Sequence, residues 1–228
     1  MCGRFALNVS AEDLSRLFGI APEGVPDLGP RFNIAPTQPV LAIRQPAEGP
    51  RAADLLRWGL VPGWARDPGM GSRMINARAE SAADRPAFRA ALRRRRCIVP
   101  ASGFYEWRAE GGGKQPYFIH RPQGELLAIA GLWERWRAQD GEDLDTCALL
   151  TTAANPDVSA LHDRMPVLLQ PGDFERWLDP TLSDPQLLAD LLQPAAIGSL
   201  VWHPVGRRVN RAGEEGPDLV HPLPTPAH

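Results

Sequence analysis

The cysteine at position 2 has the most unusual chemical potential in the chain. Cells commonly remove an initiator methionine when the second residue is small, and removal gives Cys2 a free α-amine beside its thiol. The pKa of an α-amine is about 8 and that of a thiol about 8.5, so both are partly deprotonated near neutral pH. The amine can form a Schiff base with an aldehyde, and the thiol can close a thiazolidine ring on the same carbon. A small residue at a frayed end is the alternative interpretation.

A glutamate stands inside an aromatic run within residues 97–107, which read Cys-Ile-Val-Pro-Ala-Ser-Gly-Phe-Tyr-Glu-Trp. The pattern predicts two strands with a turn at 100–103, and it places Glu106 on the second strand. A carboxylate among aromatic side chains is costly unless it is exposed or has a task. Partial burial raises the pKa of such a group and suits it to proton transfer near neutral pH. An outward-facing glutamate on an edge strand is the alternative.

Two further segments carry polar side chains suited to this chemistry. His162 lies in His-Asp-Arg-Met-Pro-Val-Leu-Leu, after a predicted short helix and before a strand, and histidine titrates near neutral pH. Asn76 and Arg78 are two residues apart, so an extended segment directs both to one side, and an arginine there suits a phosphate. A structural histidine and a loop with local hydrogen bonds are the ordinary alternatives.

Two tryptophans flank a turn in Trp-Gly-Leu-Val-Pro-Gly-Trp, residues 58–64. Packing in the core is the commoner place for a tryptophan. An exposed indole beside arginines is instead a stacking platform for bases of single-stranded nucleic acid.

Charge is unevenly distributed along the chain, although the net charge is only −2. Residues 1–110 hold 16 basic and 11 acidic side chains, whereas residues 111–228 hold 9 and 16. The chain is therefore not a generally basic nucleic-acid binder, but its first half can build a basic face. Of its 25 basic residues only Lys114 is a lysine, so phosphate contacts must come from arginine.

The elements that must position these side chains are short. Proline makes up 24 of 228 residues, about twice the usual ~5%, which disfavours a helical bundle and favours short strands joined by turns. We expect one α+β domain, rich in twisted antiparallel strands and barrel-like, with a few short helices. Predicted strands cover 39–45, 53–60, 97–101, 104–108, 116–121, 126–133 and 146–152, and predicted helices begin at Ser10 and lie near 86–95, 172–178 and 185–192.

Turn-forming residues mark the remaining segments. Ser10 is a predicted helix cap and Gly19 a helix end. Residues 20–36 are rich in Pro and Gly and are predicted as an extended loop, and Gly-Gly-Gly at 111–113 is predicted as a hairpin loop. We expect the domain to span residues 1–221 and the Pro-rich tail, 222–228, to be disordered.

The sequence lacks the motifs that usually identify several classes of protein. The three cysteines show no CxxC spacing, which argues against a disulfide framework or a structural zinc site, and we expect no metal or other cofactor. No P-loop, G-x-G-x-x-G, H-E-x-x-H or G-x-S-x-G motif occurs. No apolar run approaches the ~18 residues of a membrane span, and the start has no apolar signal segment, so we expect a cytoplasmic protein without membrane partners, in monomeric form.

The motifs together resemble one family. Their order is Cys-Gly-Arg-Phe at 2–5, Phe-Asn-Ile-Ala-Pro at 32–36, Trp-Gly-Leu-Val-Pro-Gly-Trp at 58–64, Ile-Asn-Ala-Arg-Ala-Glu at 75–80, Pro-Ala-Ser-Gly-Phe-Tyr-Glu-Trp at 100–107, Ala-Gly-Leu-Trp-Glu at 130–134 and His-Asp-Arg-Met-Pro at 162–166. This series resembles the SOS-response-associated peptidase-like (SRAP) family, which shields abasic sites in DNA. The resemblance extends from residue 2 to about residue 221.

The resemblance implies a β-rich α+β fold, a basic groove for single-stranded DNA and a covalent reaction. Cys2 matches the mature N-terminal nucleophile that forms a thiazolidine with the ring-opened abasic sugar. Asn76 matches the residue that positions the N-terminus and the sugar, Glu106 the proton shuttle, and His162 the residue that assists Schiff-base proton transfer and reversal. The expected DNA contacts, by the same matching, are Arg4, Pro36, Trp64, Arg78, Arg85, Thr151 and Arg164.

Two departures and two rival functions accompany the resemblance. Ala65 stands where some members carry a second tryptophan, which weakens stacking at a duplex junction, and residues 209–215 stray from the family's end sequence. An N-terminal-cysteine peptidase, cutting its own Met1, would use the same four residues for acyl transfer. A non-covalent reader of single-stranded DNA would need no Cys2. The expected partner is single-stranded DNA with abasic sites, including those at replication-fork junctions.

Overall fold

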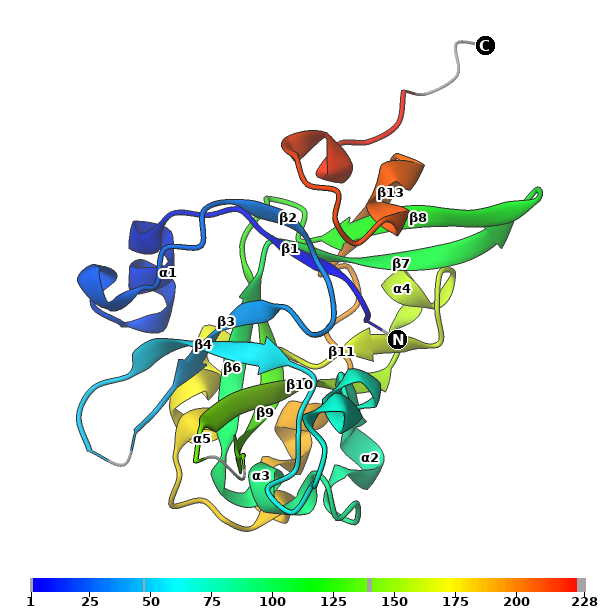
Figure 1. Cartoon of the computed structure of the whole chain (residues 1–228). Coiled ribbons are helices and arrows are strands. Elements are labelled where there is room, and N and C mark those ends of the chain that lie inside the picture. The colour runs from blue at the N-terminus through cyan, green and yellow to red at the C-terminus, as the bar shows by residue number, and fades with distance from the viewer. Residues whose placement is uncertain (1, 47, 139–140, 225–228) are drawn as a thin grey trace.

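The computed structural model describes residues 2–46, 48–138 and 141–224. Its strands form two sheets, and the smaller one contains the start of the chain (Figure 1). The order across this five-stranded sheet is β13-β8-β7-β1-β2. Its strands are β1 (Phe5–Leu7), β2 (Arg31–Ile34), β7 (Gly103–Glu110), β8 (Gly113–His120) and β13 (Val201–Pro204).

The larger, eight-stranded sheet closes on itself. Pairing runs from β10 through β4, β3, β6 and β9 and returns to β10, which makes a small barrel. The short strands β5, β11 and β12 extend this barrel at β10 and β9. Its strands are β3 (Pro39–Arg44), β4 (Ala52–Trp58), β5 (Asn76–Arg78), β6 (Arg96–Ala101), β9 (Leu127–Arg137), β10 (Asp143–Ala153), β11 (Arg164–Pro166) and β12 (Leu168–Leu169).

The predicted fold class is confirmed, with one difference in strand direction. All seven predicted strands are present and most pairings are antiparallel. However, β10 runs parallel to β4 and to β5. Parallel neighbours must be joined by a crossover, so their pairing is decided by tertiary packing and leaves no local mark in the sequence.

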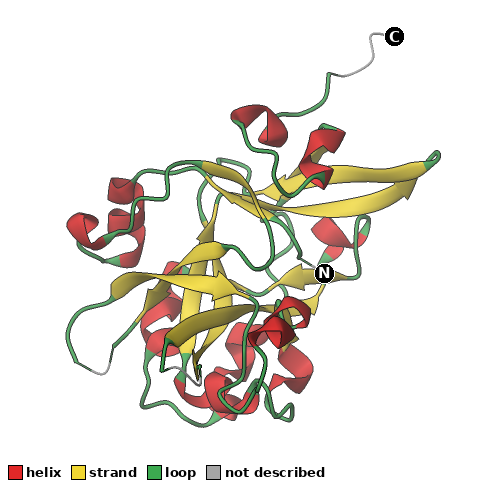
Figure 2. Cartoon of the chain, viewed as in Figure 1, coloured by secondary structure: helices red, strands yellow, loops and turns green. Residues whose placement is uncertain are grey.

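The helices are short and lie outside the sheets (Figure 2). Ser10 caps α1 by accepting the backbone N–H of Asp13, and Gly19 ends it in the left-handed region at φ 65°, as predicted. The predicted helix at 185–192 is a 3₁₀ helix. The α-helices are α1 (Ala11–Phe18), α2 (Ala79–Ala82), α3 (Arg89–Arg94), α4 (Pro156–Ser159) and α5 (Phe174–Leu178). The 3₁₀ helices are η1 (Pro22–Gly24), η2 (Pro68–Arg73), η3 (Pro171–Asp173), η4 (Pro185–Leu192), η5 (Arg207–Asn210) and η6 (Pro217–Val220).

Two loop predictions meet different outcomes. The hairpin at 111–113 is confirmed, because β7 and β8 pair directly on either side of Gly111 and Gly112, which both have positive φ. The single loop predicted for 20–36 is wrong, because it contains η1 and also β2, which pairs with β1. The many prolines and glycines predict turns correctly, but they give no sign of the four-residue strand β2, because its partner β1 lies more than 20 residues earlier in the chain.

The C-terminal prediction is tested over only part of its length. Within 222–224 the backbone N–H of Leu223 donates to the carbonyl of Pro204 at 2.9 Å, so this part contacts the domain. Residues 225–228 lie outside the described residues, and the boundary at 221 stays a prediction. Among the described residues, no helix has both the length and the apolar character to cross a membrane.

Alternate side chains of the barrel strands enter two different cores. Leu41 and Ile43 of β3 pack in the cluster that contains residues of α1, α3 and α5. Val40 and Ala42 of the same strand pack in the cluster that contains Cys2 and residues of the five-stranded sheet. Since successive strand residues point to opposite faces, the barrel holds helices on one side and the chain start on the other.

Candidate active site and nucleic-acid interface

The chain start is held between two strands. β1 pairs with β2 and β7, and the N–H of Tyr105 donates to the carbonyl of Arg4 at 2.9 Å. The ring of Phe5 meets the buried ring of Trp58 edge to face, at 5.1 Å between centroids. These contacts fix Cys2, which is fully buried beside the two sheets. Burial raises the pKa of its thiol, and the charge of Glu106 raises it further.

Asn76 links the chain start to the barrel. It begins β5, which pairs with the middle of β10, and its Nδ2 donates to the carbonyl oxygen of Cys2 at 2.7 Å. Its buried Oδ1 has no hydrogen-bond partner among the described residues. Asn76 therefore holds the backbone of Cys2 and still has an acceptor to offer.

Glu106 lies on β7 in the middle of the predicted aromatic run and is 3% exposed. Burial raises the pKa of its carboxyl, whereas nearby His162 acts in the opposite direction. Its charge also acts on the thiol of Cys2. A buried carboxyl with a raised pKa can hold and return a proton near neutral pH.

His162 lies in the connection between α4 and β11, as its sequence context predicted. Its Nδ1 accepts the backbone N–H of Arg164 at 2.9 Å and lies 2.8 Å from Oδ1 of Asp163. A neutral Nδ1 accepts the N–H of Arg164, whereas a protonated Nδ1 donates to Asp163, so each of the two contacts suits one protonation state of the ring. When the ring is protonated, Asp163 offsets the new charge.

The structure thus brings together four residues from four distant segments. Beside them is an open hollow of about 470 Å³. It is lined by Gly3, Arg4, Glu106, Trp107, Lys114, His162 and Asn210. Sequence reasoning missed Trp107, Lys114 and Asn210 as parts of this site. Two signals were available, because Lys114 is the only lysine and the predicted hairpin returns it towards the strand of Glu106.

The predicted phosphate ligand Arg4 is anchored from behind. Its Nη1 donates to Oδ1 of the buried Asn33 and to the carbonyl of Val209, each at 2.7 Å. Asn33 in turn donates to the carbonyls of Arg211 and Glu214. Asn33, the second residue of the Phe-Asn-Ile-Ala-Pro motif, is therefore a positioning residue for Arg4 at the edge of the hollow.

Two other predicted DNA contacts, Arg164 and Thr151, interact with other parts of the protein in this structure. Arg164 forms a bidentate ion pair with Glu80, at 2.7 and 2.8 Å, and donates to the carbonyl of Thr151. Thr151 is fully buried on β10. Its side chain meets no surface that a DNA strand can touch, and Arg164 can meet a phosphate only in competition with Glu80.

The two indoles of residues 58–64 have different places. Trp58 is fully buried, and its Nε1 donates to the carbonyl of Ile75 directly before Asn76. Trp64 is 60% exposed, as a stacking platform requires. Pro36 is half-buried, and Ala65 is buried with its carbonyl bonded to Trp136.

Unpaired arginines are concentrated between residues 66 and 94. This segment has seven arginines and three acidic residues, and it passes over the lower part of the molecule in Figure 1, through α2 and α3. None of these arginines has an ion-pair partner within the described part of the chain. They are Arg66, Arg73, Arg78, Arg85, Arg89, Arg93 and Arg94. Predicted ligands Arg78 and Arg85 are both exposed. The excess of basic residues in the first half of the chain is concentrated in this segment.

Comparisons with known proteins find similar chains and folds. The model of the family described as SOS response associated peptidase (SRAP) matches residues 1–212. The Bacillus subtilis (strain 168) protein named "Abasic site processing protein YoqW" is 40% identical over 224 residues, which cover 96% of this chain and 99% of that protein. The Gallus gallus protein named "Abasic site processing protein HMCES" is 32% identical and covers 98% of this chain and 78% of its own length. A crystal structure from Bacteroides thetaiotaomicron has a TM-score of 0.84 at 25% identity, covering 97% of this chain and all of that one.

Proposed function

This chain belongs to the SOS response associated peptidase (SRAP) family, and we propose that it captures abasic sites in single-stranded DNA as a thiazolidine on Cys2. Its bacterial and vertebrate relatives are named abasic site processing proteins, which supports recognition of that lesion. One arrangement carries the covalent proposal: Asn76 holds the Cys2 carbonyl at 2.7 Å, and the buried Glu106 lies on β7, which pairs with the start of the chain. Glu106 lines one hollow with Gly3 and His162.

The reaction begins with hydrolysis of the peptide bond between Met1 and Cys2, which frees the α-amine. The same residues serve this self-processing: Glu106 moves the proton of the attacking water and Asn76 keeps the Cys2 backbone in place. With the amine free, the protein is competent for aldehydes. The peptidase-like name then describes a single cleavage within its own chain.

Capture starts from the ring-opened deoxyribose, which carries an aldehyde at C1′. The α-amine adds to C1′, and the carbinolamine loses its hydroxyl as water after taking a proton from Glu106. The resulting imine joins the nitrogen of Cys2 to C1′ by a double bond. Glu106 regains its proton from the nitrogen, so it acts as a shuttle and is unchanged overall.

Ring closure needs no further reagent. The thiol of Cys2 supplies the proton that the closed ring needs. As sulfur bonds to C1′, the thiol proton passes to the imine nitrogen, which becomes the ring N–H. His162 can relay this proton and can return it when the ring reopens. The balance is protein plus DNA minus one water, and the product keeps the lesion strand intact.

DNA binding rests on separate features of the surface. Trp64 offers a stacking face, and the exposed Arg78 and Arg85 offer charge to phosphates. The hollow beside Glu106 is open, so the sugar of a lesion within a single strand can enter it. A fork junction, where a single strand adjoins a duplex, supplies such a lesion, and a monomer contains all four chemical groups.

Intact mass spectrometry tests the reaction directly. We expect the purified protein to lack the mass of Met1 and, with an oligonucleotide that carries one abasic site, to gain the oligonucleotide mass minus one water. Cys2→Ala should abolish the adduct, and Asn76→Ala and Glu106→Gln should slow it. Cys97→Ala is the matched control, since it removes another buried thiol and should leave the adduct.

Two results would contradict the proposal. Loss of Met1 without any adduct would remove the covalent step and leave a non-covalent reader of DNA. An adduct that persists in Cys2→Ala would place the reacting amine elsewhere. In a non-covalent reader, Cys2→Ala would bind the abasic strand as tightly as the unchanged protein does.

A further inference from the structure

A second hollow shares no lining residue with the hollow beside Glu106. It has a volume of about 440 Å³ and is formed mainly by one face of α3. Its lining is Arg89, Ala90, Arg93, Arg94, Arg95 and Ser183. Four guanidinium groups and one hydroxyl thus border a single depression, and its lining includes no acidic side chain.

The charges of this hollow are not balanced by the protein. Arg89, Arg93 and Arg94 are exposed, and none of them has an ion-pair partner among residues 2–46, 48–138 and 141–224. Arg95 differs, because it donates to Glu134 at 2.6 Å. The hollow therefore presents three free cations beside one that is already neutralised.

This arrangement opposes helix stability. Arg89 and Arg93 are four residues apart, where like charges on a helix repel each other. Arg89 also lies in the first turn of α3, which contains no acidic residue, although helices favour negative charge there. The macrodipole accounts for arginines in the last turn but not for Arg89. A polyanion that neutralises the three charges would relieve this repulsion.

We infer that the α3 hollow binds backbone phosphates of the same DNA strand, outside the lesion site, and this inference rests on the proposed function. β5, which carries Asn76, leads directly through α2 to α3. Arg78 ends β5, and Arg85 precedes Arg89 by one helical turn, with the Arg89 N–H on the Arg85 carbonyl at 2.9 Å. The exposed arginines thus follow the chain away from the lesion site towards the hollow.

The salt dependence of DNA binding tests this inference. The triple variant Arg89→Gln/Arg93→Gln/Arg94→Gln should bind undamaged, fluorescein-labelled single-stranded DNA more weakly at low salt. Each phosphate contact contributes about 0.7 to the slope of log K against log salt for single strands, so three lost contacts lower it by about 2. Between 50 and 200 mM salt, the unchanged protein should then lose about 20-fold more affinity than the triple variant.

A matched control separates local contacts from net charge. Arg16→Gln/Arg121→Gln/Arg137→Gln removes the same charge from other surfaces, and it should leave the slope within about 0.5 of the original. Equal slopes for the α3 variant and the unchanged protein would overturn the inference, and α3 would then suit an acidic protein. Equal losses in both triple variants would also overturn it, because net charge alone would be responsible.

The adduct assay distinguishes this inference from the proposed function. At protein concentrations that saturate the DNA, the α3 variant should form the Cys2 adduct in full yield, because the four chemical residues are unchanged. If the unchanged protein forms no adduct but the α3 variant still shows the lower slope, the covalent proposal fails and the α3 site remains. Circular dichroism and thermal melting of both variants confirm that each is folded.

Discussion

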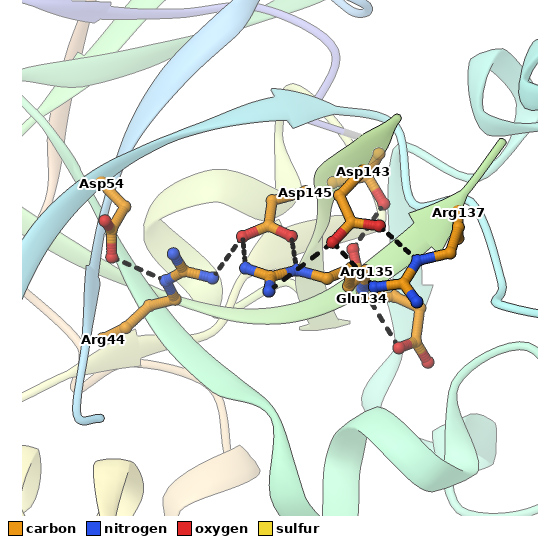
Figure 3. A network of polar contacts seen from close by, with 8 residues as sticks. Arg44, Asp54, Glu134, Arg135, Arg137, Asp143 and Asp145 are labelled. Carbon is orange, nitrogen blue, oxygen red and sulfur yellow. Dashed lines mark hydrogen bonds and ion pairs between the residues drawn. The ribbon is translucent and has the colours of Figure 1, made fainter. Parts of the chain in front are cut away.

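Two groups of arginines in this molecule have opposite environments. At one part of the barrel, Arg44 donates to Asp54 and Asp145, Arg135 to Asp145 and Arg137 to Asp143 (Figure 3). In the segment of residues 66–94, seven arginines have no such partners within the described ranges. The residue type is the same, so its partners decide whether an arginine stabilises the fold or remains available to a ligand.

The four consecutive arginines at 93–96 show this contrast within one turn of chain. Arg93 and Arg94 are exposed without partners, and Arg95 is paired with Glu134. Arg96 is 4% exposed and donates to the carbonyls of Leu92 and Trp177, among others. The chain changes from α3 to β6 at these residues, so successive side chains point in different directions. Arg93 and Arg94 face solvent, Arg95 faces Glu134 on the barrel, and Arg96 enters the core.

The largest effect on stability is expected at Arg96. Arg96→Leu should lower the free energy of unfolding by about 3 kcal/mol, because several buried carbonyls lose their donor. Urea denaturation measures the change, and Arg94→Gln is the control, with an expected change within about 0.5 kcal/mol. Similar losses in both variants would break the comparison between buried and exposed arginines.

A smaller loss is expected at Arg44. Its side chain is 15% exposed and lies 4.4 Å from the centre of the Trp133 ring as well as beside two carboxylates. Arg44→Leu leaves Asp54 and Asp145 with fewer partners, and we expect a loss of about 2 kcal/mol. DNA affinity should change less than about twofold because this network is not a phosphate surface. A large loss of affinity in a folded variant would contradict this division.

Acid should weaken the same network. The hydrogen bond from Arg135, and then that from Arg44, holds the pKa of Asp145 below its ordinary value. Stability from a carboxyl with a depressed folded pKa is present above the unfolded pKa, about 3.9, and is lost as pH falls through the folded pKa. The stability difference between the unchanged protein and Asp145→Asn should therefore shrink between about pH 5 and pH 3. A constant difference in urea denaturation across that range would exclude this role.

The smallest change in stability is expected for the exposed arginines near the site. Arg78→Gln/Arg85→Gln should alter the free energy of unfolding by no more than about 0.5 kcal/mol. It should nevertheless lower the salt slope for single-stranded DNA by about 1.4, for two lost phosphate contacts. Fluorescence anisotropy measures the salt slope, and urea denaturation measures the free energy of unfolding. Lower stability with an unchanged slope would identify these arginines as structural.

Local sequence determined much of the fold and the chemical identity of the site. Ser10 and Gly19 bound α1, Gly111 and Gly112 form the hairpin, and the predicted strands are present. Each of these features depends on residues within a few positions of one another, so local conformational preferences suffice. The sequence also identified four candidate chemical residues, and their pattern predicted the family to which the chain belongs.

Tertiary structure alone decided which side chains meet and which remain free. Arg164 pairs with Glu80 across 84 positions, Trp58 is buried whereas Trp64 is exposed, and Thr151 lies inside the barrel. The return of β10 to both β4 and β9 closes the barrel through contacts between distant segments. Ion pairing and burial depend on three-dimensional distance, which spacing in the sequence does not encode. For this reason the sequence shows where the arginines stand in the chain, but only the tertiary structure shows which of them form ion pairs and which remain exposed to a ligand.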